Sequence, residues 1–348
     1  MGDLDDFLAD NGVPAEEVAQ AEADGTLELL VAERLLRPNE GHWDLDALAG
    51  HAGLTASQMS QLWRAMGFPD PEPGEIMAGD ADLEIIERAG DRIRDPFRFE
   101  RTLQTLRVAS SSLARLAEDS ADDIGDQLAE ARAAGLTPRE RAEGLLHAID
   151  LVTITRTVGY LYRLQLLAAV RRRLTAIELG GGQQDLSIGF VDLVDFTVVS
   201  QELEPDDLAA MVSEFESRAY ETVAQQGARV VKTIGDEVMF STPSPAVAVS
   251  IALRLTADVR RGPLTPDVRG AVAHGPVVAR WGDAFGPVVN LASRLVNVAN
   301  PGTVLVSDEV HDLLVDQSAL GLRWRELRSH HLKGIGRVKP WRVSLGED

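Results

Sequence analysis

Two aspartates of this chain stand where carboxylates could hold divalent cations. Asp192 lies in the segment FVDLVDFT, where a buried apolar run gives way to a turn, and Asp236 lies in KTIGDEV, at the tip of a predicted hairpin. Carboxylates presented from neighbouring strand ends bind hard cations such as Mg²⁺ or Mn²⁺ through oxygen. Aspartate is also frequent in turns because it bonds to nearby backbone groups, so the spacing alone leaves a structural role open.

A lysine close to the second aspartate is the next candidate. The chain has three lysines among its 34 basic residues, and Lys232 stands in the same stretch, KTIGDEVMF, as Asp236. The lysine ammonium is a compact donor that suits a single acceptor atom, whereas the planar arginine fork suits carboxylates and phosphates. Lys232 is therefore a candidate for recognising a ligand that offers an acceptor nitrogen.

The segments that carry these residues alternate between strand and helix patterns from Asp185 onward. DLSIGFVDLVDF, ARVVKTI and EVMFST are strand-like, and Gly235-Asp236 joins the last two as a tight turn. Residues 205–227, PAVAVSIALRLTADVR and GPVVNLASRLVNVAN are helix-like, and VRGAVAHGPVVARW is expected to form a second hairpin about Gly275. This order predicts an α+β domain with helices on one face of a sheet.

The N-terminal half has a different pattern. Residues 1–178 are predicted to be almost entirely helical, ending in a long helix over 147–178, and a glycine-rich hinge at 179–184 separates them from residues 185–348. The apolar stretch within that helix is interrupted by Asp150, Arg156 and Arg163. We therefore expect a buried or dimer-forming helix and no insertion into a membrane.

Residues 43–70 resemble a helix-turn-helix, with LTASQMSQLWRAMG as its second helix. A recognition helix presents several basic or amide groups to phosphates and base edges. This helix has Arg64 as its one basic residue, and the block adds Asp44, Asp46 and Asp70. The composition favours a three-helix packing unit, although DNA binding remains an alternative.

Overall composition limits the partners. The 348 residues carry a net charge of −21, with 33 acidic and 18 basic residues in positions 1–180. Such a surface disfavours nucleic acids and anionic lipids as partners. The chain has no cysteine, which excludes disulfides and thiolate metal sites. Its first residues, MGDLDDFLAD, are acidic and unlike a secretion leader, so we expect a cytoplasmic protein.

Four motifs occur in a fixed order: FVDLVDFT, KTIGDEVMF, GDAFGPVVNLASR and HHLKGIG. Together they closely resemble the catalytic domain of class III nucleotide cyclases over residues 185–345. The resemblance implies a ferredoxin-like βαββαβ core and the conversion of a nucleoside triphosphate to a cyclic nucleotide and pyrophosphate. The N-terminal half resembles the all-helical regulatory domain of actinobacterial pH-responsive adenylyl cyclases, which implies autoinhibition of the catalytic domain.

The resemblance assigns roles to the candidates already found. Asp192 and Asp236 match the aspartates that hold two Mg²⁺ or Mn²⁺ ions per active site, and the backbone around Val194–Thr197, which includes Phe196 and Thr197, matches a phosphate-binding segment. The first cation would activate the ribose 3′-hydroxyl for attack on the α-phosphorus, and the second would bind the β- and γ-phosphates.

Lys232 and Asp283 match the pair that selects the base. Adenine offers N1 as an acceptor and its N6 amino group as a donor, so a donating lysine and an accepting aspartate are complementary to it. Guanine reverses these features, and guanylyl cyclases typically carry glutamate and cysteine at the two positions. The resemblance therefore implies ATP as the substrate and an adenylyl cyclase.

The last motifs supply residues for catalysis. Asn290 and Arg294 match a pair that orients the ribose and stabilises charge on the α-phosphate, and their spacing places both on one helix face. Lys333 matches a further phosphate-contacting lysine. In this family one subunit supplies the metal ligands and its partner supplies the other residues, so the resemblance implies a homodimer with two shared sites.

Regulation by pH would need groups that titrate near neutrality. Histidines are the natural candidates, and they stand at positions 42, 51, 147, 274, 311, 330 and 331. His147 is the first to test, because it is expected at the start of the long helix that enters the catalytic domain. Our hypothesis is that activity rises as the pH falls below neutral.

Two other functions compete with this interpretation. One is a DNA-binding regulator with a degenerate nucleotide-sensing domain, which the acidic N-terminal half and the intact set of cyclase residues disfavour. The other is a diguanylate cyclase of related fold. Lys232 and Asp283 indicate adenine instead, and a GGDEF-type hairpin is missing from the sequence.

Overall fold

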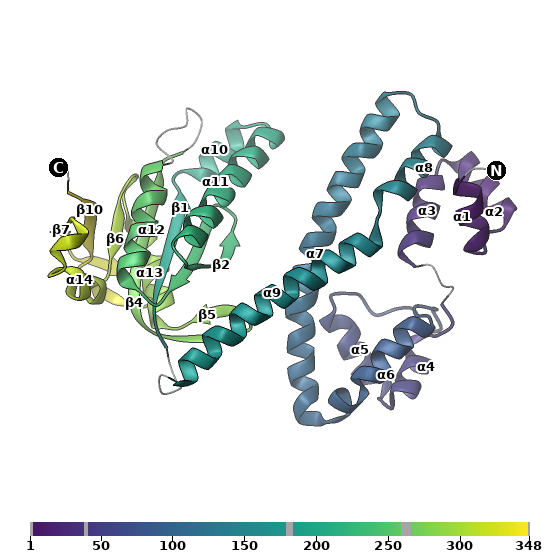
Figure 1. The fold of residues 1–348 in the computed structure, drawn as a ribbon, viewed down its shortest axis with the longest axis horizontal. Coiled ribbons are helices and arrows are strands. Elements are labelled where there is room, and N and C mark those ends of the chain that lie inside the picture. The colour runs from purple at the N-terminus through teal and green to yellow at the C-terminus, as the bar shows by residue number, and fades with distance from the viewer. Residues whose placement is uncertain (1–2, 38–40, 179–183, 259–265, 347–348) are drawn as a thin grey trace. The chain divides into compact units, whose positions relative to one another are not determined.

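A computed structural model describes residues 3–37, 41–178, 184–258 and 266–346. The chain divides into two compact units, Met1–Ala168 and Ala169–Asp348, and the division falls within helix α9 (Leu151–Glu178). Figure 1 shows the ribbon of each unit, with most of its elements labelled. The expected hinge at 179–184 lies outside the described residues except for Gln184, which begins the first strand.

The first unit is helical, as expected, and has two apolar clusters. One cluster contains residues of α1–α3 and α8, and the other contains residues of α4–α7. The long helix α7 packs on both, through Phe99 and Leu103 near its start and Ile124 further along. The helices are α1 (Asp3–Asp10), α2 (Ala15–Asp24), α3 (Leu27–Leu36), α4 (Leu45–Ala52), α5 (Ala56–Ala65), α6 (Asp80–Arg94), α7 (Pro96–Ala133) and α8 (Pro138–Ala148).

The block that resembles a helix-turn-helix consists of α4 and α5. Thr55 caps α5 through a capping box with Gln58, an arrangement that satisfies two backbone N–H groups at the helix start. The inner face of α5 packs into the α4–α7 cluster through Met59 and Leu62. Arg64 forms an ion pair with Asp70 at 3.3 Å. These contacts favour the interpretation as a packing unit.

The helix expected over 147–178 begins later than predicted. Helix α8 starts at a Thr137–Glu140 capping box and continues to Ala148, so His147 lies in its last turn and not at the start of the next helix. Asp150 accepts hydrogen bonds from the backbone N–H (3.0 Å) and hydroxyl (2.6 Å) of Thr153, which makes it the cap of α9. The sequence contained this capping signal, but the apolar run on both sides of it concealed the break.

No helix within the described ranges combines the length and apolar character needed to cross a membrane.

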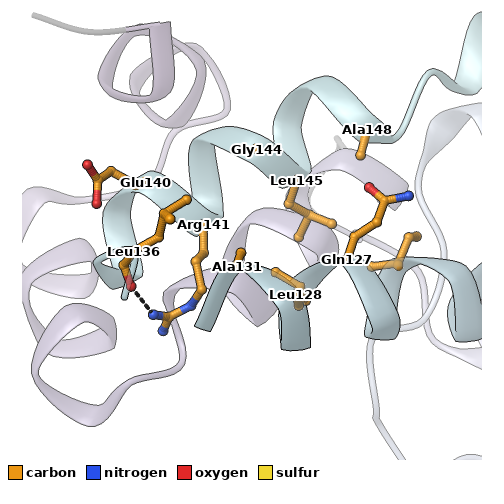
Figure 2. A pocket seen from close by; sticks show the side chains of 10 residues that line it. Gln127, Leu128, Ala131, Leu136, Glu140, Arg141, Gly144, Leu145 and Ala148 are labelled. Carbon is orange, nitrogen blue, oxygen red and sulfur yellow. Dashed lines mark hydrogen bonds between the residues drawn. The ribbon is translucent and has the colours of Figure 1, made fainter. Parts of the chain in front are cut away.

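A small cavity of about 120 Å³ lies between α7 and α8. Its lining is mostly apolar, with Leu128 and Leu145 on its walls (Figure 2). Arg141 borders it, but the guanidinium donates to the Leu136 carbonyl oxygen at 2.7 Å and to the buried Glu28 at 2.6 Å. The charged group at the cavity edge is thus already paired within the first unit.

The second unit contains a sheet with the predicted ferredoxin-like core. Its strands run in the order β2-β3-β1-β4-β6-β10-β7, with β5 paired to β4. The first four are antiparallel neighbours, and in chain order they form βαββαβ, which confirms the expected core. The strands are β1 (Gln184–Leu193), β2 (Arg229–Ile234), β3 (Glu237–Thr242), β4 (Val268–Arg280), β5 (Asp283–Phe285), β6 (Val304–Val306), β7 (Leu322–Glu326) and β10 (Trp341–Leu345), and β8 (His330–Leu332) pairs with β9 (Gly336–Val338).

Helices cover both faces of this sheet, so the expectation of one covered face was wrong. Alternate residues of a strand point to opposite faces, and Val191 packs in a cluster with α11, α12 and α14 whereas Phe190 packs in a cluster with α13. The strands are apolar on both faces, and a pattern search cannot assign a helix to a face of such strands. The helices are α10 (Phe196–Glu202), α11 (Pro205–Gln225), α12 (Pro245–Asp258), α13 (Pro287–Val298) and α14 (Asp308–Leu314).

The expected hairpin about Gly275 is also wrong. Gly275 lies inside β4, paired with Leu186 of β1, and has a φ of 146° that disfavours other residues. An added Cβ would also lie 3.1 Å from the Cγ2 of Val288 in α13. The chain reverses later, at Trp281 and Gly282, between β4 and β5. The predicted turn at Gly235-Asp236 joins β2 to β3 as expected.

Candidate active site

The two predicted metal-binding aspartates lie close together at one end of the sheet. Asp192 is the penultimate residue of β1 and lies opposite Glu237 of β3 in the ladder. Asp236 belongs to the turn just before β3, and its carbonyl oxygen accepts a hydrogen bond from the N–H of Leu193 at 3.2 Å. Asp192 is 8% exposed, and the side chains of Asp236 and Glu237 are half-buried.

Burial and repulsion by neighbouring carboxylates make Asp236 and Glu237 hard to ionise. Burial raises the pKa of Asp236, and the neighbouring Asp192 raises it further. Burial raises the pKa of Glu237 to about 7, with Asp192 and Asp236 as the next causes. Carboxylates that share a site behave in this way because ionising one opposes ionising the others. The sequence analysis did not identify Glu237 as part of this group.

Arg269 is a second residue that the sequence analysis missed. It lies opposite Asp192 on β4 and donates from Nη2 (2.6 Å) and Nε (2.8 Å) to the same oxygen, Oδ2 of Asp192. Its Nη1 also reaches the carbonyl oxygen of Asn297 at 3.3 Å, near the end of α13. Only the register of β1 against β4 brings the two residues together, and the motifs gave no signal for it.

The site fits divalent cations of the hard, oxygen-binding kind. Asp192 and Asp236 offer only oxygen donors, and a cation bound to them would relieve the repulsion that, after burial, helps to raise the pKa values of Asp236 and Glu237. The described part of the chain contains no group of three or more His, Cys, Asp or Glu side chains arranged to hold a metal. Further oxygen ligands would therefore have to come from a bound substrate or water.

The predicted base-selecting pair is in direct contact. Nζ of Lys232, on β2, donates to Oδ2 of Asp283 at 2.6 Å, where β5 begins. The other carboxylate oxygen, Oδ1, accepts the N–H of Ala284 at 2.8 Å. The side chains of Lys232 and Asp283 are 38% and 27% exposed, so they present one donor and one acceptor at an accessible surface. Lys232 lies within strand β2, whereas Asp236 lies in the turn between β2 and β3.

Asn290 and Arg294 both lie on α13 and are exposed. Among the described residues, neither side chain has a hydrogen bond or ion pair, so the structure does not join them to the aspartates or to Lys232. Asn290 borders a cavity of about 590 Å³, which Gly334 also lines. Lys333 is exposed in the turn between β8 and β9 and directly precedes Gly334. The structure thus brings the loop of Lys333 to the cavity that Asn290 borders.

The expected phosphate-binding segment lies at the start of α10. Phe196 and Thr197 are its first residues, and Asp195 before them has a φ of 57°. The N–H of Val194, which was expected to contribute, already donates to the carbonyl oxygen of Asp267 at 2.7 Å. The segment available for a phosphate is therefore shorter than the sequence suggested.

Comparison with known proteins agrees with this arrangement. Residues 181–344 match the model of the adenylate and guanylate cyclase catalytic domain. An adenylate cyclase of Glutamicibacter nicotianae is 30% identical over 317 residues, which cover 86% of this chain and 78% of that protein. The chain belongs to the class III cyclase family. An adenylate cyclase of Streptomyces coelicolor is 31% identical to this cyclase, over 88% of this chain and 78% of that protein.

A third relative matches almost the whole cyclase. A protein of Mycobacterium tuberculosis named as a pH-sensitive adenylate cyclase is 26% identical over 357 residues, which cover 99% of this chain and 87% of that protein. Because the family model begins at residue 181, this likeness includes the helical half as well. The relationship therefore extends to the N-terminal unit and is not confined to the catalytic domain.

Proposed function

We propose that this cyclase converts ATP to 3′,5′-cyclic AMP and pyrophosphate. The observation that carries the choice of ATP is the Lys232–Asp283 pair, in which a donor and an acceptor lie 2.6 Å apart at an accessible surface. Lysine can donate to N1 of adenine and aspartate can accept from its N6 amino group. Guanine would place a donor against the lysine and an acceptor against the aspartate, which leaves polar groups unpaired.

In the reaction, a bond forms between the ribose 3′-oxygen and the α-phosphorus while the bond from that phosphorus to the β-phosphate oxygen breaks. Two cations, Mg²⁺ or Mn²⁺, held by Asp192 and Asp236 would supply Lewis-acid chemistry to the 3′-hydroxyl and the phosphates. The proximity of three carboxyl groups to one arginine, Arg269, supports this cation requirement, because a nucleoside triphosphate would otherwise be repelled.

The remaining residues act by positioning and charge. Asn290 orients the ribose, and Arg294 stabilises the charge that develops on the α-phosphate. Lys333 and the backbone of Phe196 and Thr197 bind phosphate oxygens. The exposure of Asn290, Arg294 and Lys333 supports these roles, because their polar groups are available to a ligand.

We further propose that two copies of the chain form each active site. Within one chain, Asn290 and Arg294 have no bond to the aspartates or to the Lys232–Asp283 pair. A homodimer would place the metal ligands of one protomer against the base-selecting and charge-stabilising residues of its partner, and its symmetry would create two equivalent sites.

The substrate can be tested by measuring cyclic AMP from ATP and cyclic GMP from GTP with the full-length protein, in Mg²⁺ and in Mn²⁺. We expect cyclic AMP with either cation and a kcat/KM for ATP at least about 100-fold higher than for GTP, as hydrogen-bonded sites achieve. Equal use of the two nucleotides would refute the proposed role of Lys232 and Asp283.

A further inference from the structure

The turn before Asp283 has an unusual backbone conformation. Trp281 and Gly282 join β4 to β5 with φ angles of 54° and 79°, and Arg280 and Asp283 are paired across them. Two successive positive φ angles are typical of a type I′ turn, which Gly, Asn and Asp adopt readily. A tryptophan in the first position is strained, and strain of this kind persists only where other contacts stabilise it.

Arg229 provides such a contact from a distant strand. It is the first residue of β2, and its Nη2 donates a hydrogen bond to the carbonyl oxygen of Gly282. In the sheet, β3 and β1 lie between β2 and β4, so this bond joins segments that no strand ladder connects. The Arg229 side chain is half-buried, and burial is the main cause that lowers its pKa.

Arg229 and Lys232 hold two parts of the same turn. They stand on one strand, and Lys232 binds the carboxylate of Asp283 while Arg229 binds the carbonyl oxygen just before it. The second carboxylate oxygen is fixed by the N–H of Ala284. With Arg229 in place, the backbone that carries Asp283 cannot swing away from Lys232 without breaking a charge-assisted hydrogen bond.

We propose that Arg229 is a positioning residue for base recognition. By holding Gly282 it fixes the carboxylate of Asp283 at the place where the N6 amino group of adenine can donate to it. This inference rests on the proposed function, in which Lys232 and Asp283 recognise adenine. Asp236 lies beyond the opposite end of β2, so the metal-binding end of the sheet does not depend on the Arg229 bond.

The test compares two substrates, ATP and purine riboside triphosphate, which keeps N1 but lacks the N6 amino group. In the full-length protein, Arg229→Gln should lower kcat/KM for ATP about tenfold and change that for the analogue by less than about twofold, because only ATP uses Asp283 as an acceptor. Arg229→Lys, which keeps a charged donor, should retain part of the preference for ATP. Arg254→Gln, at an exposed position of α12, is the matched control and should behave as wild type.

A purely structural role would give a different result. The positioning role is overturned if Arg229→Gln lowers kcat/KM by the same factor for both substrates, or lowers it for neither. Thermal unfolding of each variant then shows whether loss of folded protein explains an equal fall. In an Asp283→Ala background, Arg229→Gln should not change the preference further, because the group that it positions is gone. A wild type that does not distinguish the two substrates would overturn recognition of the N6 amino group by Asp283, and the role of Arg229 with it.

Discussion

The carboxyl groups of Asp192, Asp236 and Glu237 concentrate negative charge at one end of the sheet. Arg269 compensates part of it through two bonds to one oxygen of Asp192. The other two groups have raised pKa values, chiefly through burial. A site of this kind binds protons when cations are absent and releases them when cations bind. The proposed cation requirement thus follows from the charge of the protein itself as well as from the chemistry of the nucleotide.

In metal-free protein, the variant Glu237→Gln should reveal the free-energy cost of ionising Glu237, which comes from burial and from the neighbouring carboxylates. The pKa of Glu237 is raised from 4.5 to about 7, so its contribution to stability is fully present below pH 4.5 and is lost as the pH rises through about 7. Glutamine mimics the neutral form, so the variant should match wild type at pH 4.5. At pH 8 its free energy of unfolding should be higher by about 1 to 2 kcal/mol, since solvent screens part of the effect at this partly exposed position, as measured by urea denaturation.

Glu221→Gln, at an exposed position of α11, serves as the control and should change little at either pH. Adding Mn²⁺ should reduce the advantage of Glu237→Gln, because a bound cation removes the same repulsion. If the variant is equally stable or less stable than wild type at pH 8, then ionised Glu237 does not destabilise the folded protein.

At the level of elements, the sequence predicted those features that depend on local signals. The β2–β3 hairpin was predicted because Gly235 provides the positive φ that a tight turn needs. The β4–β5 turn was missed because Trp281 is an atypical residue for its conformation, and Gly275 was a misleading signal inside a strand. Arg269 was missed because its contact with Asp192 depends on the register of strands far apart in the sequence.

Helix α9 has an apolar surface that one chain leaves exposed. Tyr160, Leu164 and Leu167 follow spacings of four and three residues, with exposed fractions of 55%, 46% and 47%. Arg171 occupies the next position of this pattern, and Leu174, which is 55% exposed, occupies the one after it. Apolar side chains at alternating spacings of three and four residues form the seam of a coiled coil. This pattern supports the expected dimer-forming helix. Helix α9 is the element through which two protomers could contact each other in a homodimer.

The double variant Leu164→Glu and Leu167→Glu should therefore weaken the dimer, because it places charge in the proposed seam and removes apolar burial from both protomers. We expect the dimer dissociation constant to rise at least about tenfold, with cyclase activity falling in parallel. Sedimentation velocity measures the first quantity. Gln165→Glu, which adds charge at an exposed polar position, is the control, and a double variant that remains as dimeric as this control would refute a seam on α9.

For the whole molecule, we expect the N-terminal unit to regulate the catalytic domain. The relative named as pH-sensitive matches 99% of the chain, and an acid response of this cyclase stays our hypothesis. At the proposed metal-binding end, protonation would work in the opposite direction, because it removes negative charge from Asp236 and Glu237 that would attract cations. A rise in activity on acidification would therefore have to come from other groups, and we expect them in the N-terminal unit.

Deleting residues 1–150, which leaves helix α9 and its proposed dimer seam in place, should raise the basal rate and abolish any increase in activity between pH 8 and pH 6. The reason is that the proposed inhibitory unit and its titrating groups are removed together, whereas the catalytic domain keeps the carboxyl groups that bind cations. Initial rates of cyclic AMP formation across this pH range, for both proteins, provide the measurement. An unchanged rate and pH profile in the truncated protein would refute inhibition by the N-terminal unit.

The most direct test of the central claim is to mix two inactive variants, Asp192→Ala and Asn290→Ala, and to measure cyclic AMP formation. If two protomers share each site, a mixed dimer keeps one complete site, so an equimolar mixture should recover about a quarter of the wild-type rate. Each variant alone should be inactive. A mixture as inactive as its components, although mixed dimers form, would contradict the shared active site.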